Sequence, residues 1–157
     1  MNVEVDLDTA IRLTLDANRL TDRLWQGSAP PAGDLLGKLG FDVVVLCADD
    51  VALTQADFPG VTVVQIATKD EKAAPVSAEH ARLAHEAAAQ AVQHHRDGKT
   101  VLVTCLGGFN RSGLVSAVVL HELLGWSFAR CVRHIQEARD FALHNKHFVR
   151  YLKGLDP

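Results

Sequence analysis

Cysteine is rare in this chain: only Cys47, Cys105 and Cys131 occur among its 157 residues. The three lie far apart and follow no spacing typical of metal ligands. An odd number of cysteines without a signal peptide argues against a disulfide scaffold and favours a reducing compartment. We therefore expect a cytoplasmic protein.

Long apolar runs and a strong net charge are also absent. No run approaches the length of a membrane span, and the net charge of -3 indicates no general surface for nucleic acid or membrane. The eight histidines do not show the spacing of metal ligands together with a carboxylate or a cysteine. We therefore expect them at the surface. We expect no metal and no cofactor. Without repeats or linkers, the sequence predicts a single domain over residues 1–157, with residues 1–20 as an N-terminal extension of uncertain structure.

Apolar runs of strand length are present instead. Three of them have the Val- and Leu-rich composition of strands covered on both faces: residues 41–47, 62–66 and 101–104. Residues 23–28 predict a short edge strand that ends at Gly27. Residues 1–20 stay undecided, because Val3, Val5 and Leu7 alternate like a strand, whereas Leu7, Ile11 and Leu15 repeat like a helix.

Helical patterns separate these runs. Ser77 is typical of an N-cap, and Gly98 lies just past the expected end of the longest helix. Further helices are predicted over residues 34–39, 112–124, 127–138 and 148–152. This alternation predicts an α/β fold, in which a central, mostly parallel (mixed) sheet of four to five strands is flanked by helices on both faces.

Residues 101–113, VLVTCLGGFNRSG, join a buried strand, a glycine-containing loop and a helix N-terminus. This backbone arrangement cradles phosphate, because successive N–H groups point inward. The phosphate-binding residues would be Leu106, Gly107, Gly108, Phe109, Asn110 and Arg111. The glycines permit unusual φ values and a close approach of the ligand, and Arg111 can bind two phosphate oxygens in a fixed fork.

Cys105 would lie at the focus of these dipoles, which favour a thiolate. Its attack on phosphorus would give a phosphocysteine intermediate, and Ser112 would hydrogen-bond the sulfur when it leaves. The carboxyl ends of parallel strands meet at one edge of a sheet, so the loops after Leu46 and Ile66 converge on the same place. The leaving oxygen needs a proton, for which Asp70 is the first candidate and Glu71 the next.

The sequence resembles the cysteine-dependent phosphatases, specifically the small dual-specificity type, whose signature is His-Cys-x-x-Gly-x-x-Arg-Ser/Thr. Cys105, Gly108, Arg111 and Ser112 fall in register with it, and Thr104 stands where the family usually has His. Asp70 lies 35 residues before Cys105, where the general acid of the family usually sits. The resemblance covers about residues 20–155. It implies a dual-specificity phosphatase-like fold, no cofactor, and a phosphorylated protein as partner, with phosphotyrosine first and phosphoserine or phosphothreonine next.

Other functions of the same superfamily stay open. The loop also resembles that of RNA 5'-triphosphatases, the one alternative that would bring a nucleic-acid partner. Phosphoinositide phosphatases usually carry lysines inside the loop, and residues 106–110 contain none. A catalytically weak module that binds phosphorylated partners is a further alternative. Rhodanese-type sulfur transferases are disfavoured, because their loops usually have one residue fewer between Cys and Arg.

Two further features lie outside this motif. Cys47 ends an apolar run and is a candidate redox partner that would form a protective disulfide with Cys105, although a buried structural thiol is an equal alternative. From Gly125 onward, six Lys or Arg accompany three acidic residues. We interpret these cations as solvated helix faces, the alternative being a basic rim for an anionic substrate.

Overall fold

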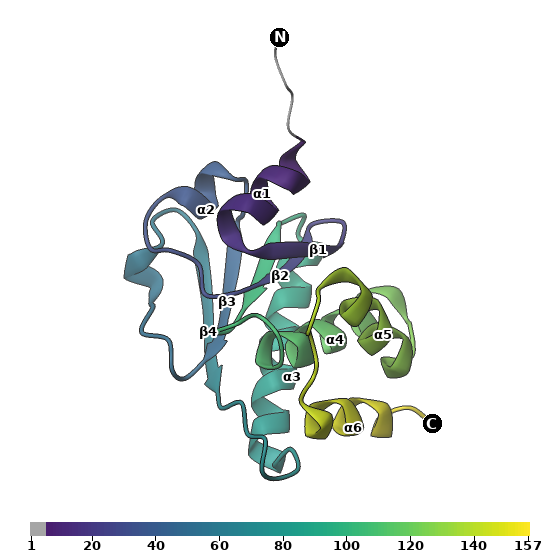
Figure 1. The fold of residues 1–157 in the computed structure, drawn as a ribbon. Helices are drawn as coiled ribbons and strands as arrows, with labels where there is room; N and C mark the ends of the chain where they lie inside the picture. The colour runs from purple at the N-terminus through teal and green to yellow at the C-terminus, as the bar shows by residue number, and fades with distance from the viewer. Residues whose placement is uncertain (1–5) are drawn as a thin grey trace.

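The computed structural model of this chain describes residues 6–157 (Figure 1). Its strands are β1 (Ala17–Thr21), β2 (Leu24–Gly27), β3 (Val43–Ala48), β4 (Thr62–Thr68) and β5 (Val101–Thr104). Its helices are α1 (Leu7–Leu15), α2 (Leu35–Lys38), a 3-10 turn (Gln55–Asp57), α3 (Ala78–Arg96), α4 (Arg111–Leu124), α5 (Phe128–Ala138) and α6 (Lys146–Gly154). Helices and strands alternate, as the sequence pattern predicts.

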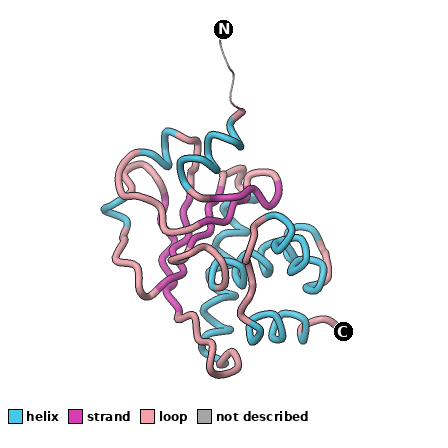
Figure 2. Tube along the Cα trace, viewed as in Figure 1, coloured by secondary structure: helices cyan, strands magenta, loops and turns pink. Residues whose placement is uncertain are grey.

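The five strands form one mixed sheet in the order β1-β2-β5-β3-β4. β1 is antiparallel to β2, and the remaining neighbours are parallel. The sheet is a single band with helices outside it (Figure 2). The predicted α/β fold with a mostly parallel, mixed sheet of four to five strands is therefore confirmed.

The predicted edge position of residues 23–28 is wrong. All four residues of β2 are buried, because β1 covers one side of the strand and β5 the other. The undecided segment supplies this cover: a helix over Leu7–Leu15 is followed directly by the edge strand Ala17–Thr21. The strand alternation of Val3 and Val5 lies outside the described residues.

Each face of the sheet has its own apolar core, since side chains alternate along a strand. One core packs α1 and α2 on side chains such as Val44 and Leu102. The other packs α3, α4, α5 and α6 on alternate positions such as Val45 and Val103. α4 is buried over its first ten residues, so the helix that begins at Arg111 is anchored at the centre of the molecule.

The expectation that the histidines lie at the surface is confirmed in part: His144 is exposed, and none of the other seven is fully buried. These seven are partly buried, and several bond backbone oxygens; a ring nitrogen of His134, for example, lies 2.6 Å from the carbonyl oxygen of Leu20.

Within residues 6–157, no single helix is long and apolar enough to cross a membrane; α4 and α5 reach that length together, across a bend of 120°.

Candidate functional site

The loop between β5 and α4 directs its carbonyl groups away from its centre. Leu106 O accepts from Ala29 N at 3.1 Å, Phe109 O accepts from Leu143 N at 3.0 Å, and Asn110 O accepts from Leu114 N at 2.8 Å. Within the described chain, no backbone N–H of residues 106–110 donates to another protein group. A ring of free, inward N–H groups is the arrangement that binds an anion.

Gly108 shows why this loop needs glycine. Its φ is +76°, and a Cβ added there would lie 2.3 Å from the carbonyl carbon of Gly27. Any side chain would therefore push the loop away from the end of β2. Gln26, in the buried strand β2, reaches the same point and donates its side-chain N–H to Gly108 O at 3.0 Å.

Arg139 completes the support of this loop, and the sequence pattern did not single it out. Its side chain is 4% exposed, and it donates to Gly108 O at 2.8 Å and to Gly107 O at 2.9 Å. The same guanidinium binds the carboxylate of Asp16 at 3.1 Å and the side-chain oxygen of Asn18 at 3.0 Å. One buried cation thus joins the loop to the N-terminal strand β1, in the segment that the sequence left undecided.

Cys105 and Ser112 meet across the loop. The sulfur of Cys105 lies 3.3 Å from the Ser112 hydroxyl, and both residues are buried. Thr104 turns away from them, because its hydroxyl donates to Val45 O at 2.9 Å on the neighbouring strand. The hydroxyl of Thr104, at the position where the family usually has His, is therefore hydrogen-bonded to a neighbouring strand of the sheet. Ser112 is the side chain that hydrogen-bonds the thiol.

Some nitrogens of the Arg111 guanidinium are hydrogen-bonded to the protein, and others are left for a ligand. Nη1 donates to Asp50 at 2.9 Å, to Thr68 O at 3.1 Å and to Asp49 at 3.4 Å, while Nη2 has only a 3.4 Å contact with Asp50. Nε is buried and has no hydrogen-bond partner within residues 6–157. The hydrogen bond from Arg111 holds the pKa of the Asp50 carboxyl below its ordinary value. The edge formed by Nε and Nη2 is thus the pair of donors left for a ligand.

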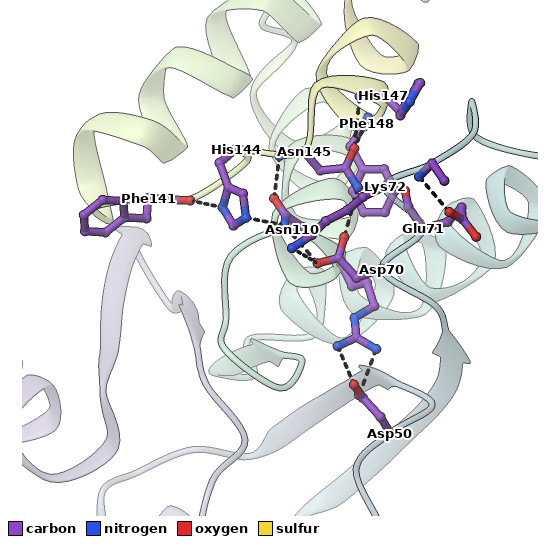
Figure 3. A network of polar contacts seen from close by, with 12 residues as sticks. Asp50, Asp70, Glu71, Lys72, Asn110, Phe141, His144, Asn145, His147 and Phe148 are labelled. Carbon is purple, nitrogen blue, oxygen red and sulfur yellow. Dashed lines mark hydrogen bonds and ion pairs between the residues drawn. The ribbon is translucent and has the colours of Figure 1, made fainter.

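Asp70 lies in the loop after β4, where its side chain is hydrogen-bonded to Asn110 (Figure 3). Asn110 belongs to the loop of residues 105–111, which we call the phosphate loop after its expected ligand. One carboxylate oxygen accepts from the side-chain amide of Asn110 at 3.0 Å, and the other accepts from that of Asn145 at 2.9 Å. Asn145 also caps α6 and donates its backbone N–H to Asn110 at 2.9 Å. The sequence showed no sign of Asn145, because it acts across 75 residues of chain.

Glu71, the second candidate acid, turns elsewhere. Its carboxylate accepts the backbone N–H of Ala73 at 2.7 Å, within its own loop. Only its carbonyl takes part in the network, as an acceptor for Asn145 at 2.9 Å. Beneath this loop lies a cavity of about 430 Å³, with His80 and Phe148 in its wall. The structure therefore joins Asp70, and not the Glu71 side chain, to the phosphate loop.

Cys47 lies beside Cys105 in the sheet. Leu46 of β3 pairs with Thr104 of β5, so the two cysteines follow at equivalent positions on parallel neighbours. Both are free and buried. Burial raises the pKa of the Cys47 thiol, and the nearby Cys105 raises it further. Cys47 is therefore held as a neutral thiol. Cys131 lies apart on α5, where burial raises its pKa to about 11.

An anion bound at the free N–H groups of residues 106–110 would lie near the Cys105 thiol and the Asp70 carboxyl group. No group of three or more His, Cys, Asp or Glu that could hold a metal ion occurs within residues 6–157.

Residues 24–155 match the family model described as dual specificity phosphatase, catalytic domain. The chain matches no curated protein sequence. Among solved structures it is similar to human DUSP28, with 25% identity and a TM-score of 0.75 over 89% of this chain and 92% of that one. A mouse putative dual specificity phosphatase complexed with zinc tungstate has 23% identity and a TM-score of 0.76, over 99% and 91% of the two chains.

A third similar structure, PTPMT1 in complex with PI(5)P, has 19% identity and a TM-score of 0.73 over 88% of this chain and 92% of that one. At this identity the likeness concerns the fold alone.

Proposed function

This chain belongs to the dual-specificity phosphatase family, and from that premise we propose that it hydrolyses phosphate monoesters on proteins. Phosphotyrosine is the first substrate and phosphoserine or phosphothreonine the next. The observation that carries the proposal is the loop of residues 105–111, in which the described carbonyls are bonded outward and the N–H groups of residues 106–110 stay free. A dianionic phosphate, with roughly two negative charges at neutral pH, matches such a ring of donors.

In the proposed first step, the Cys105 thiolate attacks phosphorus. A sulfur–phosphorus bond forms, the bond from phosphorus to the leaving oxygen breaks, and Asp70 gives its proton to that oxygen. The Nε and Nη2 donors of Arg111 bind two equatorial oxygens, which supports the transition state because the guanidinium is already fixed by Asp50 and Thr68.

In the proposed second step, water attacks the phosphocysteine. Asp70 takes a proton from the water, inorganic phosphate leaves, and Cys105 departs as a thiolate. The Ser112 hydroxyl, 3.3 Å from the sulfur, supports this departure by hydrogen-bonding the developing negative charge.

Hydrolysis of an aryl phosphate in the presence of a chelator tests the proposal. We expect activity that vanadate inhibits and that Cys105→Ser abolishes, with the variant still folded by circular dichroism. Activity that survives this substitution would refute the cysteine mechanism. Comparing phosphotyrosine peptide, phosphoserine peptide, phosphoinositide and 5'-triphosphorylated RNA then identifies the substrate class, and faster turnover of either non-protein substrate would overturn the protein assignment.

We also propose that Cys47 protects Cys105 from oxidation. A disulfide suits their adjacent strand positions, because parallel neighbours lie about 4.8 Å apart, within the usual range for bridged cysteines. Peptide mapping after mild peroxide treatment should recover a peptide that links Cys47 to Cys105. Recovery of Cys105 as sulfinic acid, with no linked peptide, would refute the proposal that Cys47 protects it.

A further inference from the structure

A groove between α5 and α6 lies next to the phosphate loop and is lined by unpaired cations. It has a volume of about 720 Å³, and its lining includes Lys146, Arg150 and Lys153 from α6. The partly exposed Val149 supplies apolar surface between them, and the buried Leu143 lies behind it. No carboxylate lines the groove among the described residues, so its character is cationic with an apolar floor.

These three cations differ from others in the protein because they have no acidic partner within residues 6–157. Within residues 6–157, none of the three forms an ion pair, whereas Arg82 on α3 binds both Glu79 and Glu86. Residues 141–155 contain three of the sixteen Lys and Arg of the chain and none of its nineteen Asp and Glu. In a chain with a net charge of -3, this concentration of positive charge is local to α6.

His144 connects the groove to the catalytic centre. It lines the groove, and its Nε2 lies 3.1 Å from the side-chain amide nitrogen of Asn110 in the phosphate loop. Its other ring nitrogen lies 2.8 Å from Phe141 O (Figure 3). A substrate whose phosphate occupies the loop would therefore extend over His144 into the groove within a few residues.

We propose that this groove binds an acidic segment of the phosphoprotein substrate, close in sequence to the phosphorylated residue. The proposal rests on the proposed function and extends it to the sequence around the phosphate. Lys146, Arg150 and Lys153 lie on one face of α6, about 6 Å and 4.5 Å apart along its axis. Alternate side chains of an extended peptide are about 6.6 Å apart, so acidic residues at alternate positions match the spacing of Lys146 and Arg150.

A concave groove with an apolar floor favours a peptide over a lipid surface. A peptide strand can enter the hollow between the two helices and place its apolar side chains on Val149, which is partly exposed. A bilayer attracts basic residues that project from a surface, because the potential of anionic lipids falls off within a Debye length.

The test uses two phosphotyrosine peptides that differ only in flanking Glu or Gln residues, with an aryl phosphate as the small substrate. For the wild type, we expect kcat/KM to be roughly tenfold higher for the acidic peptide, mainly through KM, which corresponds to a few exposed charge pairs. Arg150→Glu/Lys153→Glu should abolish this preference and leave aryl phosphate turnover unchanged. Raising the salt concentration should weaken the preference in the wild type.

The matched control is Arg96→Glu/Lys99→Glu, which changes the net charge equally before β5, at exposed cations that form no ion pair within residues 6–157. It should keep the preference for the acidic peptide. Equal loss in both double variants would mean that net charge, and not the groove, selects the substrate, which would overturn the proposal.

Two further measurements separate the remaining outcomes. If no substrate is hydrolysed, the proposed function fails, and binding of the fluorescent acidic peptide to the protein still tests the groove by anisotropy. Sedimentation with phosphatidylserine vesicles tests the lipid alternative. Vesicle binding that requires Arg150 and Lys153, together with equal kcat/KM for the two peptides, would overturn the peptide assignment.

Discussion

The loop after β5 and the loop after β4 meet at the same edge of the sheet but are held there differently. In the first, buried residues such as Arg139 and Gln26 bond the carbonyl groups from outside. In the second, residues 71–75 are exposed, and Asp70 is held by two amide groups that belong to other segments. The proposed phosphate cradle is thus part of the core, whereas the proposed acid, Asp70, is attached to it by side-chain hydrogen bonds.

This difference has a physical consequence for stability and catalysis. Segments with few buried contacts open at a lower free energy than the core that carries them. Damage to the loop after β5 should therefore affect folding or all substrates alike. Damage to the loop after β4 should lower kcat/KM only for substrates whose leaving oxygen needs a proton. The following substitutions test this difference between the two loops.

Arg111→Lys should have the largest effect, a loss of about 10³-fold in kcat/KM for every substrate. An ammonium group cannot reproduce the planar Nε and Nη2 donors, although it keeps the charge. Steady-state kinetics with good and poor leaving groups provides the measurement. A loss of less than tenfold would show that the fork is not used.

Arg139→Met should lower the free energy of unfolding by about 3 kcal/mol, because it leaves Gly107 O without its donor, Gly108 O with Gln26 alone and Asp16 without its cation. Denaturant titration measures this change. Arg133→Met is the control, since this cation is exposed, and it should change stability by less than about 0.5 kcal/mol. Equal stability of the two variants would contradict the role of Arg139.

Asp70→Asn should lower kcat/KM for an alkyl phosphate about 10²-fold and that for a nitrophenyl phosphate only a little, because kcat/KM reports the first step, in which a good leaving group needs no proton. Glu71→Gln, in the same loop, should leave both rates unchanged. The reverse pattern would transfer the role of the acid to Glu71.

Asn145→Asp should act on the same step more weakly, with a loss of about tenfold for poor leaving groups. Aspartate keeps the N-cap of α6 but cannot donate to Asp70, so the helix stays capped while the acid loses one of its two amide partners. Unchanged leaving-group dependence, measured on the same substrate pair, would mean that Asn145 does not position the acid.

Asp50→Asn should have the smallest effect. Arg111 lowers the pKa of Asp50 in the folded state, so the carboxylate stabilises the fold above its unfolded pKa of about 3.9, and this contribution is lost as the pH falls through the folded pKa. The side chain is half exposed, so we expect about 0.5 kcal/mol. Urea titrations should show a constant difference between wild type and variant above about pH 5 that disappears in acid. A difference that persists in acid would contradict this pairing.

Much of the fold was predictable because its signals are local. The buried strands β3 and β5 read as apolar runs, and Ser77 caps α3 as predicted. The expectation that residues 62–66 form a strand covered on both faces is wrong, because β4 lies at an edge of the sheet and exposes Gln65 and Ala67 on one face. The edge of the sheet was not predictable, because Ala17–Thr21 has no apolar pattern of its own and is ordered by pairing with β2.

The sequence by itself determined the loop to which we assign phosphate binding, since Cys105, Arg111 and Ser112 lie within one short segment whose backbone requires Gly108. Only the tertiary structure decided what holds this loop and its acid. Asp50, Arg139 and Asn145 reach the site across 61, 31 and 75 residues of chain, and such distances leave no periodic pattern to read. Their positions follow from the packing of the sheet and helices.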